Sequence, residues 1–366
     1  MCNKLSKIET VLGPISPDKL GTTLMHEHVF VDLATVWLKR RAEEIRTIHG
    51  SKLTYIDKKV SIEFLGKLRR GDIICKDDMI ISDENLVSEE LAEYKKWGGV
   101  SIVDQGMPGL GRDVLGLKRM ANLLGLNLIA VTGFYNHHSH PSYVKKMSVE
   151  DLKNHFIKEL TEGIEGTPIK AGGIGEVANT EPVPHHPEEK KVLEASFLAQ
   201  TEVGCSFTLH PSKIDSPRKK MVTYGELYLD MLDKAGANIN KFYLSHADWF
   251  TWDMKYLRRL LDRGATLLFD TFGMESYSGP PYFPRNRTPN DVERVTAIFE
   301  LCEAGYDKQL VLSHDMCSKH MLKRYGGYGF SHILEHIVPE LLEWGTSQKQ
   351  IDNCLLYTSP SPRDRG

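Results

Sequence analysis

The sequence predicts an α/β protein, a TIM-type (β/α)8 barrel with a helical insertion after the first strand. Short β-like runs alternate with amphipathic stretches along nearly the whole chain, and eight such units follow one another in order. Most of the amphipathic stretches end at a glycine, the residue that most commonly ends a helix. Parallel strands need crossover helices, and eight such units close naturally into a barrel whose active site lies at the carboxyl ends of the strands.

The first predicted strand is 24–30. A polar segment from about 39 to 88 follows it. This segment is too long for an ordinary connection, and we expect it to form a helical insertion over one end of the barrel. The other predicted strands are 99–104, 127–135, 169–177, 205–210, 241–246, 265–270 and 309–315.

Helices are predicted where apolar residues recur every three to four positions. In 114–125 these residues are Val114, Leu117, Met120 and Leu124. The other expected helices are 88–98, 148–166, 187–204, 224–236, 251–264, 290–305 and 331–344.

The 366 residues can bury a large core, and length alone allows one barrel with insertions or two domains. A doubly wound open sheet is the alternative architecture. No convincing Gly-x-Gly-x-x-Gly follows a first strand, however, and the glycine-rich stretch 106–116 is better explained as a loop. We therefore expect a single barrel domain over 1–353. Residues 354–366 are rich in Ser, Pro and Arg, so we expect a disordered or artefactual tail without function.

The composition favours a soluble, near-neutral protein. Charged residues make up 26 % of the chain and the formal net charge is −3, so no basic surface for nucleic acid is expected. No apolar run approaches the ~18 to 20 residues that span a bilayer, so no membrane segment is expected. The six cysteines are scattered and the first residues lead into no apolar signal region. These features predict a cytoplasmic protein, with a homodimer left open.

His26 and His28 lie two residues apart in the first predicted strand. Side chains of a strand alternate between its two faces, so both imidazoles project to the same side and can hold one metal ion. Alone this pattern is weak, because His-x-His also occurs by chance. Its weight comes from the other strands, which repeatedly end on a side chain able to bind a metal.

Polar side chains stand at the end of every predicted strand. Beyond the two histidines they are Asp104, Tyr135, Glu176, His210, His246, Asp270 and Asp315. Each alone has an ordinary explanation, as a hydrogen-bonded polar residue or a helix N-cap. Together, four histidines and two carboxylates from strands one, four, five, six and eight would converge on one barrel mouth. That inventory fits two divalent ions that share a bridging carboxylate.

Four ordered motifs carry a family resemblance. They are Leu-Gly-Thr-Thr-Leu-Met-His-Glu-His at 20–28, Ile-Lys-Ala-Gly-Gly-Ile-Gly-Glu at 169–176, Leu-Ser-His-Asp at 312–315 and Lys-Arg-Tyr-Gly-Gly-Tyr-Gly-Phe-Ser-His at 323–332. With them the sequence resembles the phosphotriesterase-like family of the amidohydrolase superfamily over nearly its whole length, and most narrowly its phosphotriesterase-related branch.

The resemblance implies how the metal ligands divide. His26, His28 and Asp315 would bind the more buried ion, and His210 and His246 the more exposed one. The fourth strand would supply the bridge between the two ions.

Many members of the family bridge the ions with a carboxylated lysine, and the fourth strand does contain Lys170. Lys170 and Glu176 are separated by an even number of positions, so both side chains could face the inside of the barrel. The six positions between them are nevertheless roughly 20 Å along a strand. Only Glu176 stands at the carboxyl end, level with His26. The phosphotriesterase-related branch also bridges with a glutamate, so we predict Glu176 as the bridge.

The predicted chemistry is hydrolysis by a hydroxide that bridges two metal ions about 3.5 to 4 Å apart. Zinc is the expected metal, and manganese or cobalt suits the same mixed ligands. Asp315 can take the proton of this water and pass it to the leaving group, unless it is only a structural ligand. Tyr135 matches a tyrosine beside the metals of related lactonases, where it would orient a substrate carbonyl. Packing at the barrel rim explains it equally well.

The phosphotriesterase-related branch implies hydrolysis of an acyl amide of the N-acetyltaurine type. Ester or lactone hydrolysis with promiscuous phosphotriesterase activity is the second interpretation, and a metal-binding barrel without catalysis is the third. Thr271 stands where related phosphotriesterases have a proton-relay histidine and related lactonases an arginine, so both of those activities lose support. Asp248 either supports the metal site, as its counterpart in the family does, or caps the helix that begins near 251.

Two further sets of polar residues belong to predicted loops. Arg285 and Arg287 could grip the anionic end of a substrate or lie in a solvated loop. His137, His138 and His140 follow the third strand, and we expect them to be polar loop residues rather than part of the site.

Overall fold

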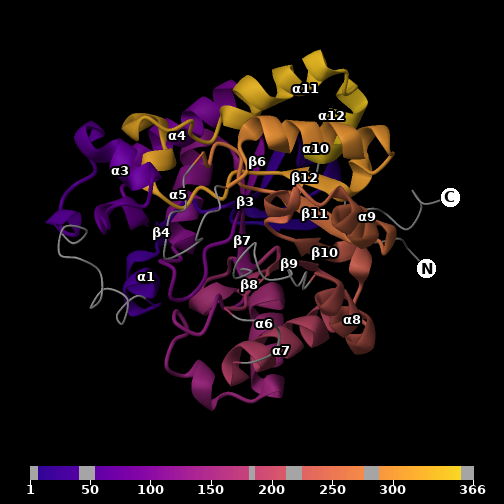
Figure 1. Ribbon diagram of the computed structural model, residues 1–366. Helices are drawn as coiled ribbons and strands as arrows, with labels where there is room; N and C mark the ends of the chain where they lie inside the picture. Colours follow the sequence, from indigo (N-terminus) through magenta and orange to yellow (C-terminus); the bar gives the residue numbers. More distant parts are fainter. Residues whose placement is uncertain (1–6, 41–53, 181–185, 212–224, 276–287, 356–366) are drawn as a thin grey trace.

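The computed structural model describes residues 7–40, 54–180, 186–211, 225–275 and 288–355, and it confirms the predicted (β/α)8 barrel (Figure 1). Eight strands form one sheet in the order β12-β11-β10-β9-β8-β7-β6-β3, so strands that follow one another in the chain are neighbours in the sheet. Every ladder within this sheet is parallel. The strands are β3 (Thr23–Glu27), β6 (Ser101–Asp104), β7 (Asn127–Thr132), β8 (Gly173–Ala178), β9 (Ser206–His210), β10 (Phe242–Leu244), β11 (Thr266–Phe269) and β12 (Leu310–Leu312).

Helices surround the strands in Figure 1, and their ends follow ordinary capping rules. Ser148 and Asp151 form a capping box at the start of α6, and Asn290 and Glu293 form one at the start of α10. Gly204 ends α7 in the left-handed conformation that glycine adopts without strain. The helices are α1 (Ala34–Arg40), α3 (Leu65–Arg69), α4 (Glu84–Lys96), α5 (Val114–Leu124), α6 (Val149–Thr161), α7 (Pro187–Val203), α8 (Gly225–Ala235), α9 (Met254–Asp262), α10 (Asp291–Glu303), α11 (Val338–Trp344) and α12 (Gln348–Leu355).

The insertion after β3 is less helical than predicted over its described residues 54–83, which lie between α1 and α4. Apart from the short helix α3 it contains 3₁₀ turns and the strand β5 (Ile80–Ile81), which pairs antiparallel with β4 (Val31–Asp32). The helix predicted from residue 88 is α4, which begins at Glu84 because the Asp83 side chain accepts from the first free main-chain N–H groups.

Ion pairs join this insertion to the segment that follows β12. Asp77 Oδ1 lies 2.8 Å from Lys319 Nζ, and Asp78 Oδ2 lies 2.8 Å from His320 Nδ1. Asp78 also accepts from the main-chain N–H of His320 at 2.9 Å. The insertion is therefore anchored at the end of the barrel where the predicted metal ligands lie.

The carboxyl-terminal part of the chain differs from the prediction in two ways. The helix expected over 331–344 begins as a π-helical turn over Ile333–Ile337 and continues as α11. The sequence analysis missed α12, in which Cys354 and Leu355 are buried, so the first two residues of the expected tail belong to a helix. Residues 356–366 lie outside the described residues.

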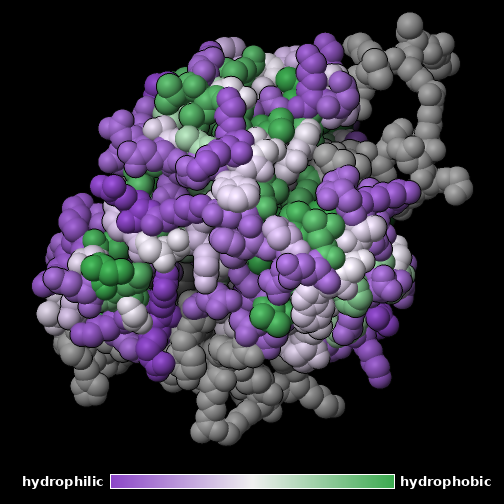
Figure 2. Space-filling model, turned by 90° about the horizontal axis from the view of Figure 1, so that it is seen from above, coloured by the Kyte–Doolittle hydropathy of each residue, from purple (hydrophilic) through white to green (hydrophobic). Residues whose placement is uncertain are grey.

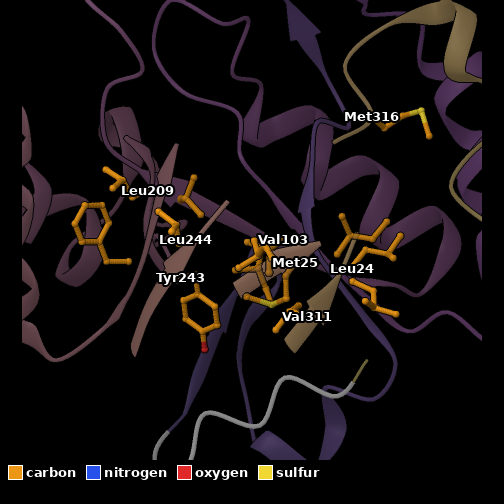
Figure 3. Packing of buried hydrophobic residues seen from close by; sticks show 14 of the residues in the cluster. Leu24, Met25, Val103, Leu209, Tyr243, Leu244, Val311 and Met316 are labelled. Carbon is orange, nitrogen blue, oxygen red and sulfur yellow. The ribbon is translucent and has the colours of Figure 1, made fainter. Parts of the chain in front are cut away.

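An apolar core fills the barrel and packs the helices against it. In Figure 3, Met25 and Val103 lie together, and their strands β3 and β6 form a ladder. Leu209 and Leu244 are register partners on β9 and β10 and also belong to this core. Because polar side chains follow these apolar strand residues at the carboxyl ends, the core ends where the candidate site begins.

The hairpin of β1 (Ile8–Thr10) and β2 (Gly13–Ile15) lies at the end of the barrel where β8 and β9 begin, opposite the candidate site. A cavity of about 370 Å³ there is lined by residues of β1 and by the first residues of β8 and β9. Seen from above, the surface carries separate apolar patches among hydrophilic side chains (Figure 2). Among the described helices, none has both the length and the apolar composition of a membrane span.

Candidate metal centre

The structure brings together all six residues that the sequence analysis predicted as metal ligands. They form two groups of three at the carboxyl ends of the strands, and within each group the potential ligand atoms lie within 4.8 Å of one another. The first group is His26, His28 and Asp315, and the second is Glu176, His210 and His246.

Glu176 lies between the two groups. Its Oε1 is 3.2 Å from His26 Nε2 in the first group and 3.6 Å from His246 Nε2 in the second. The same oxygen is 4.0 Å from His210 Nε2, and its Oε2 is 3.9 Å from His28 Nε2. One carboxylate thus faces histidines of both groups, which is the position that a bridging ligand needs.

Asp315 completes the first group from the segment after β12. Its Oδ1 lies 3.1 Å from His28 Nε2 and 3.7 Å from His26 Nε2. The Asp315 side chain is 15 % exposed, whereas that of Glu176 is 3 % exposed. Of the two carboxylates, Asp315 is therefore the one that a substrate or a water molecule reaches more easily.

Irregularities in two strands set the direction of two candidate ligands, His26 and Glu176. On β3, Met25 and His26 together oppose a single residue of β6, and on β8, Gly175 and Glu176 together oppose Thr208 of β9. Such bulges bend a strand and turn a side chain toward a new direction. Gly175 has a φ of +152°, and a Cβ there would lie 2.8 Å from the Thr208 Cβ, so glycine is required beside Glu176.

Asp270, which follows β11, holds one histidine of each group. Its Oδ2 lies 2.6 Å from His26 Nδ1 and its Oδ1 lies 2.8 Å from His246 Nδ1. When each imidazole donates from Nδ1 to this carboxylate, its Nε2 is left as an acceptor that faces Glu176, as metal-binding histidines require. The sequence analysis placed Asp270 at a strand end but assigned it no role.

Charge at the centre also suits a cation. Burial disfavours the charged form of His246, but Asp270 and then Glu176 outweigh burial and raise the pKa of His246 to about 10. For His26, Glu176 and Asp270 likewise outweigh burial and raise the pKa well above its ordinary value. The carboxylates thus favour positive charge between the imidazoles, and a metal ion that binds Nε2 would replace the proton there.

The side chains present fit a pair of divalent metal ions. His26 Nε2 and Glu176 Oε1 are both buried and 3.2 Å apart, and when His26 donates from Nδ1 to Asp270 both are acceptors that no donor among the described residues satisfies. Buried polar atoms are normally satisfied, and a divalent cation would satisfy both of these. Imidazole nitrogen with carboxylate oxygen is a donor set that zinc accepts, and manganese and cobalt accept it as well.

Tyr135 lies beside the second group. Its hydroxyl oxygen is 3.3 Å from His210 Nε2, and the two rings meet edge to face with centroids 5.3 Å apart. This position is compatible with the predicted contact to a substrate carbonyl. The role of Tyr135 in catalysis stays a prediction.

Arg294 of α10 is the centre of a buried ionic network. The network includes Asp248, which lies two residues after His246 of the second group. Arg294 Nε is 2.8 Å from Asp248 Oδ2, and its Nη1 is 2.8 Å from Asp291 Oδ1. Thr271 accepts from Arg294 Nη2 at 2.8 Å and its hydroxyl also donates to Asp248. Asp291 in turn lies 2.6 Å from His332 Nε2. The sequence analysis missed Arg294, because a charged residue in an amphipathic helix normally faces solvent.

Of the two roles predicted for Asp248, that of a helix cap is wrong. Asp253, not Asp248, caps α9, since the Asp253 side chain accepts from the main-chain N–H of Tyr256. Asp248 is fully buried, and burial raises its pKa although Arg294 opposes the shift. Its contacts with Arg294 and Thr271 join the segment that carries His246 to the end of β11.

Other residues singled out in the sequence lie away from the two groups. Lys170 precedes β8 and so stands at the opposite end of this strand from the ligands. His137 binds Glu189 at 2.7 Å, as a polar loop residue. Arg285 and Arg287 lie outside the described residues, and their predicted contact with an anionic group stays a prediction.

Fold and site together define a class: a (β/α)8 barrel with a candidate two-metal centre, built from imidazoles and carboxylates, at the carboxyl ends of its strands. The family model that matches residues 6–362 is that of the phosphotriesterase family. The chain belongs to the phosphotriesterase family, which confirms the resemblance found in its motifs.

Individual relatives match along almost the whole chain. The N-acetyltaurine hydrolase of Salmo salar is 35 % identical over 351 residues, which cover 96 % of this chain and 95 % of that protein. The phosphotriesterase-related protein of Nematostella vectensis is 34 % identical and covers 94 % of both chains. Among solved structures, a resiniferatoxin-binding protein from Rhodobacter sphaeroides has a TM-score of 0.84 at 30 % identity, over 97 % of this chain and 93 % of that chain.

Proposed function

We propose that this protein is a zinc-dependent hydrolase that cleaves an acyl amide of the N-acetyltaurine type. The observation that carries the proposal is the position of Glu176, whose Oε1 faces histidines of both ligand groups at 3.2 and 3.6 Å. The relative from Salmo salar that is named N-acetyltaurine hydrolase matches 96 % of the chain and supports the amide as the substrate class.

The two groups of ligands would hold one zinc ion each, with Glu176 shared between them. When bound, two such ions supply Lewis acidity, which makes a water molecule easier to deprotonate and polarises an acyl carbonyl. Asp270 keeps His26 and His246 turned so that their Nε2 atoms face the centre.

Asp315 is the proposed proton carrier. As the more exposed carboxylate of the centre, it can accept a proton from the attacking water and return it to the nitrogen of the leaving group. In the complete reaction the water oxygen joins the acyl carbon and the carbon–nitrogen bond breaks. With N-acetyltaurine as substrate, the amine released is taurine and the acid released is acetate.

Tyr135 is the proposed contact for the substrate carbonyl. Its hydroxyl lies 3.3 Å from His210 Nε2, so it can donate to an oxygen that enters beside the second group. The hydrogen bond would strengthen as negative charge develops on that oxygen.

Taurine release from N-acetyltaurine by the zinc-supplemented protein tests the proposed function. We expect release of taurine, and its loss when the same sample is treated with a chelator. Lactones and carboxylic esters are assayed beside the amide. Turnover of lactones or esters without taurine release would overturn the amide assignment in favour of the second interpretation. A protein that binds zinc and turns over none of them would be a metal-binding barrel without catalysis.

A further inference from the structure

The barrel closes where β12 meets β3, and this seam differs from the other strand contacts. Main-chain ladders join the other neighbouring strands, but among the described residues none joins β12 to β3, although the two strands are in contact (Figure 1). The first ligand group spans the seam, since β3 carries His26 and leads to His28, and β12 leads to Asp315. Its geometry therefore depends on what holds the seam together.

Glu27 lies between the two histidines and holds the seam with its carboxylate. Its Oε1 accepts from the main-chain N–H of His314 at 2.9 Å, and lies 2.8 Å from His314 Nδ1 and 2.7 Å from Ser313 Oγ. Its Oε2 accepts from the main-chain N–H of Met316 at 3.1 Å. The residues on both sides of Asp315 are thus bound to one buried carboxylate.

The same contacts fix the main chain of Asp315. Its N–H donates to the His26 carbonyl oxygen at 3.0 Å, and its φ of +53° lies in the left-handed region that residues other than glycine rarely adopt. Ser313 Oγ accepts from the His26 N–H at 2.9 Å. The His314 Nε2 accepts from the Ile333 N–H at 3.3 Å, which leaves the imidazole proton on Nδ1 to donate to the carboxylate.

We infer that Glu27 is a positioning residue of the metal centre, which closes the barrel at the seam and thereby brings Asp315 to His26 and His28. Glu27 belongs to neither ligand group, because both of its oxygens accept hydrogen bonds from the segment after β12. This inference rests on the proposed function, since it takes the first ligand group to be a zinc site.

The test compares Glu27→Gln with Glu90→Gln as a matched control. Glu90 is a buried glutamate of α4 that also holds a loop, since it accepts from the main-chain N–H groups of Lys323 and Arg324 at 3.1 and 2.9 Å. In either variant the NH₂ group of the new glutamine would face a main-chain N–H group, and two donors cannot form a hydrogen bond. Both variants should therefore unfold at a lower temperature than the wild type. Zinc affinity is measured without substrate, by competition with a chelator. We expect Glu27→Gln to weaken one zinc site by about 10- to 100-fold and to spare the other.

The cobalt-substituted protein gives a second readout. We expect the visible absorption of the bound cobalt to change in Glu27→Gln, because the ligand geometry changes, and to stay as in the wild type in Glu90→Gln. Excess zinc should restore hydrolysis to Glu27→Gln more than it restores that of a variant lacking a ligand.

The outcomes separate this inference from the proposed function. A wild-type protein that fails to bind two zinc ions would overturn the proposed function. A wild type that binds two, beside a Glu27→Gln variant with unchanged affinities, would overturn only the inference, and so would an equal loss in Glu90→Gln. If Glu27→Gln does not fold, Ser313→Ala replaces it. That variant removes the hydroxyl shared by Glu27 and His26, and unchanged zinc affinity there would overturn the inference as well.

Discussion

Replacing Glu176 by glutamine should reduce taurine release from N-acetyltaurine by roughly a thousandfold, because the metal ions that would stabilise the transition state are bound less well. The carboxylate of Glu176 faces histidine nitrogens of both ligand groups, at 3.2 Å from His26 and 3.6 Å from His246. A neutral amide is a weaker ligand and cannot balance the charge of two neighbouring cations. Both metal sites should therefore lose affinity together.

The measurement for Glu176→Gln is zinc content per chain together with the rate of taurine release. Glu189→Gln serves as the control. Glu189 is also a buried glutamate near the barrel mouth, but its carboxylate binds His137 and Thr180 rather than a ligand group. We expect the control to keep both zinc and activity. A Glu176→Gln variant with two zinc ions and most of its activity would contradict the bridging role.

Replacing Asp315 by asparagine should lower kcat by about 10²- to 10⁴-fold, the range that positioned proton transfer contributes. The asparagine oxygen can take the position of Asp315 Oδ1, which lies 3.1 Å from His28 Nε2, and can still bind the metal there. Most of the zinc should therefore remain bound at a saturating zinc concentration. KM should change little, because the substrate is bound by other groups. The loss would then report the proton that the carboxylate no longer carries.

The assay for Asp315→Asn records kcat, KM and zinc content in excess zinc. A purely structural ligand predicts a different result, in which activity returns as soon as zinc is restored. Recovery of nearly wild-type kcat in excess zinc would therefore reject Asp315 as the proton carrier and leave it as a ligand only.

The barrel could be predicted from the sequence because two periodicities repeat along the chain. The run 205–210 and the apolar spacing in 114–125 need only local information, and each corresponds to an element of the structure, β9 and α5. The family model that matches residues 6–362 confirms the family that the motifs indicated. The described part of the insertion was harder to predict, since its 3₁₀ turns and two-residue strands have no periodicity long enough to recognise.

The candidate ligands could also be predicted, because parallel strands bring their carboxyl ends to one mouth. His26, Glu176 and His210 lie within strands, as the local sequence predicts. The strands predicted to include His28, His246 and Asp315 are shorter in the structure, and these three residues follow the strand ends. What the sequence could not show is how distant residues support them. Asp270 bonds to His26, which is 244 positions away, and no local pattern marks that pair.

Glu27 and Arg294 illustrate the same limit in different ways. The alternation of the strand shows that Glu27 faces away from the two histidines, but its partners lie after β12 and appear only when the barrel closes. Arg294 is fully buried because Asp248 and Asp291 both approach it. An arginine between apolar helix positions otherwise indicates a solvent-facing side chain.

The most direct test of the two-metal hydrolase is a zinc titration of the chelator-treated protein, followed by taurine release from N-acetyltaurine. The arrangement of Glu176 between two groups of ligands predicts that activity returns with added zinc and reaches its plateau at two equivalents per chain. A plateau at one equivalent, or hydrolysis that survives complete removal of the metal, would contradict it.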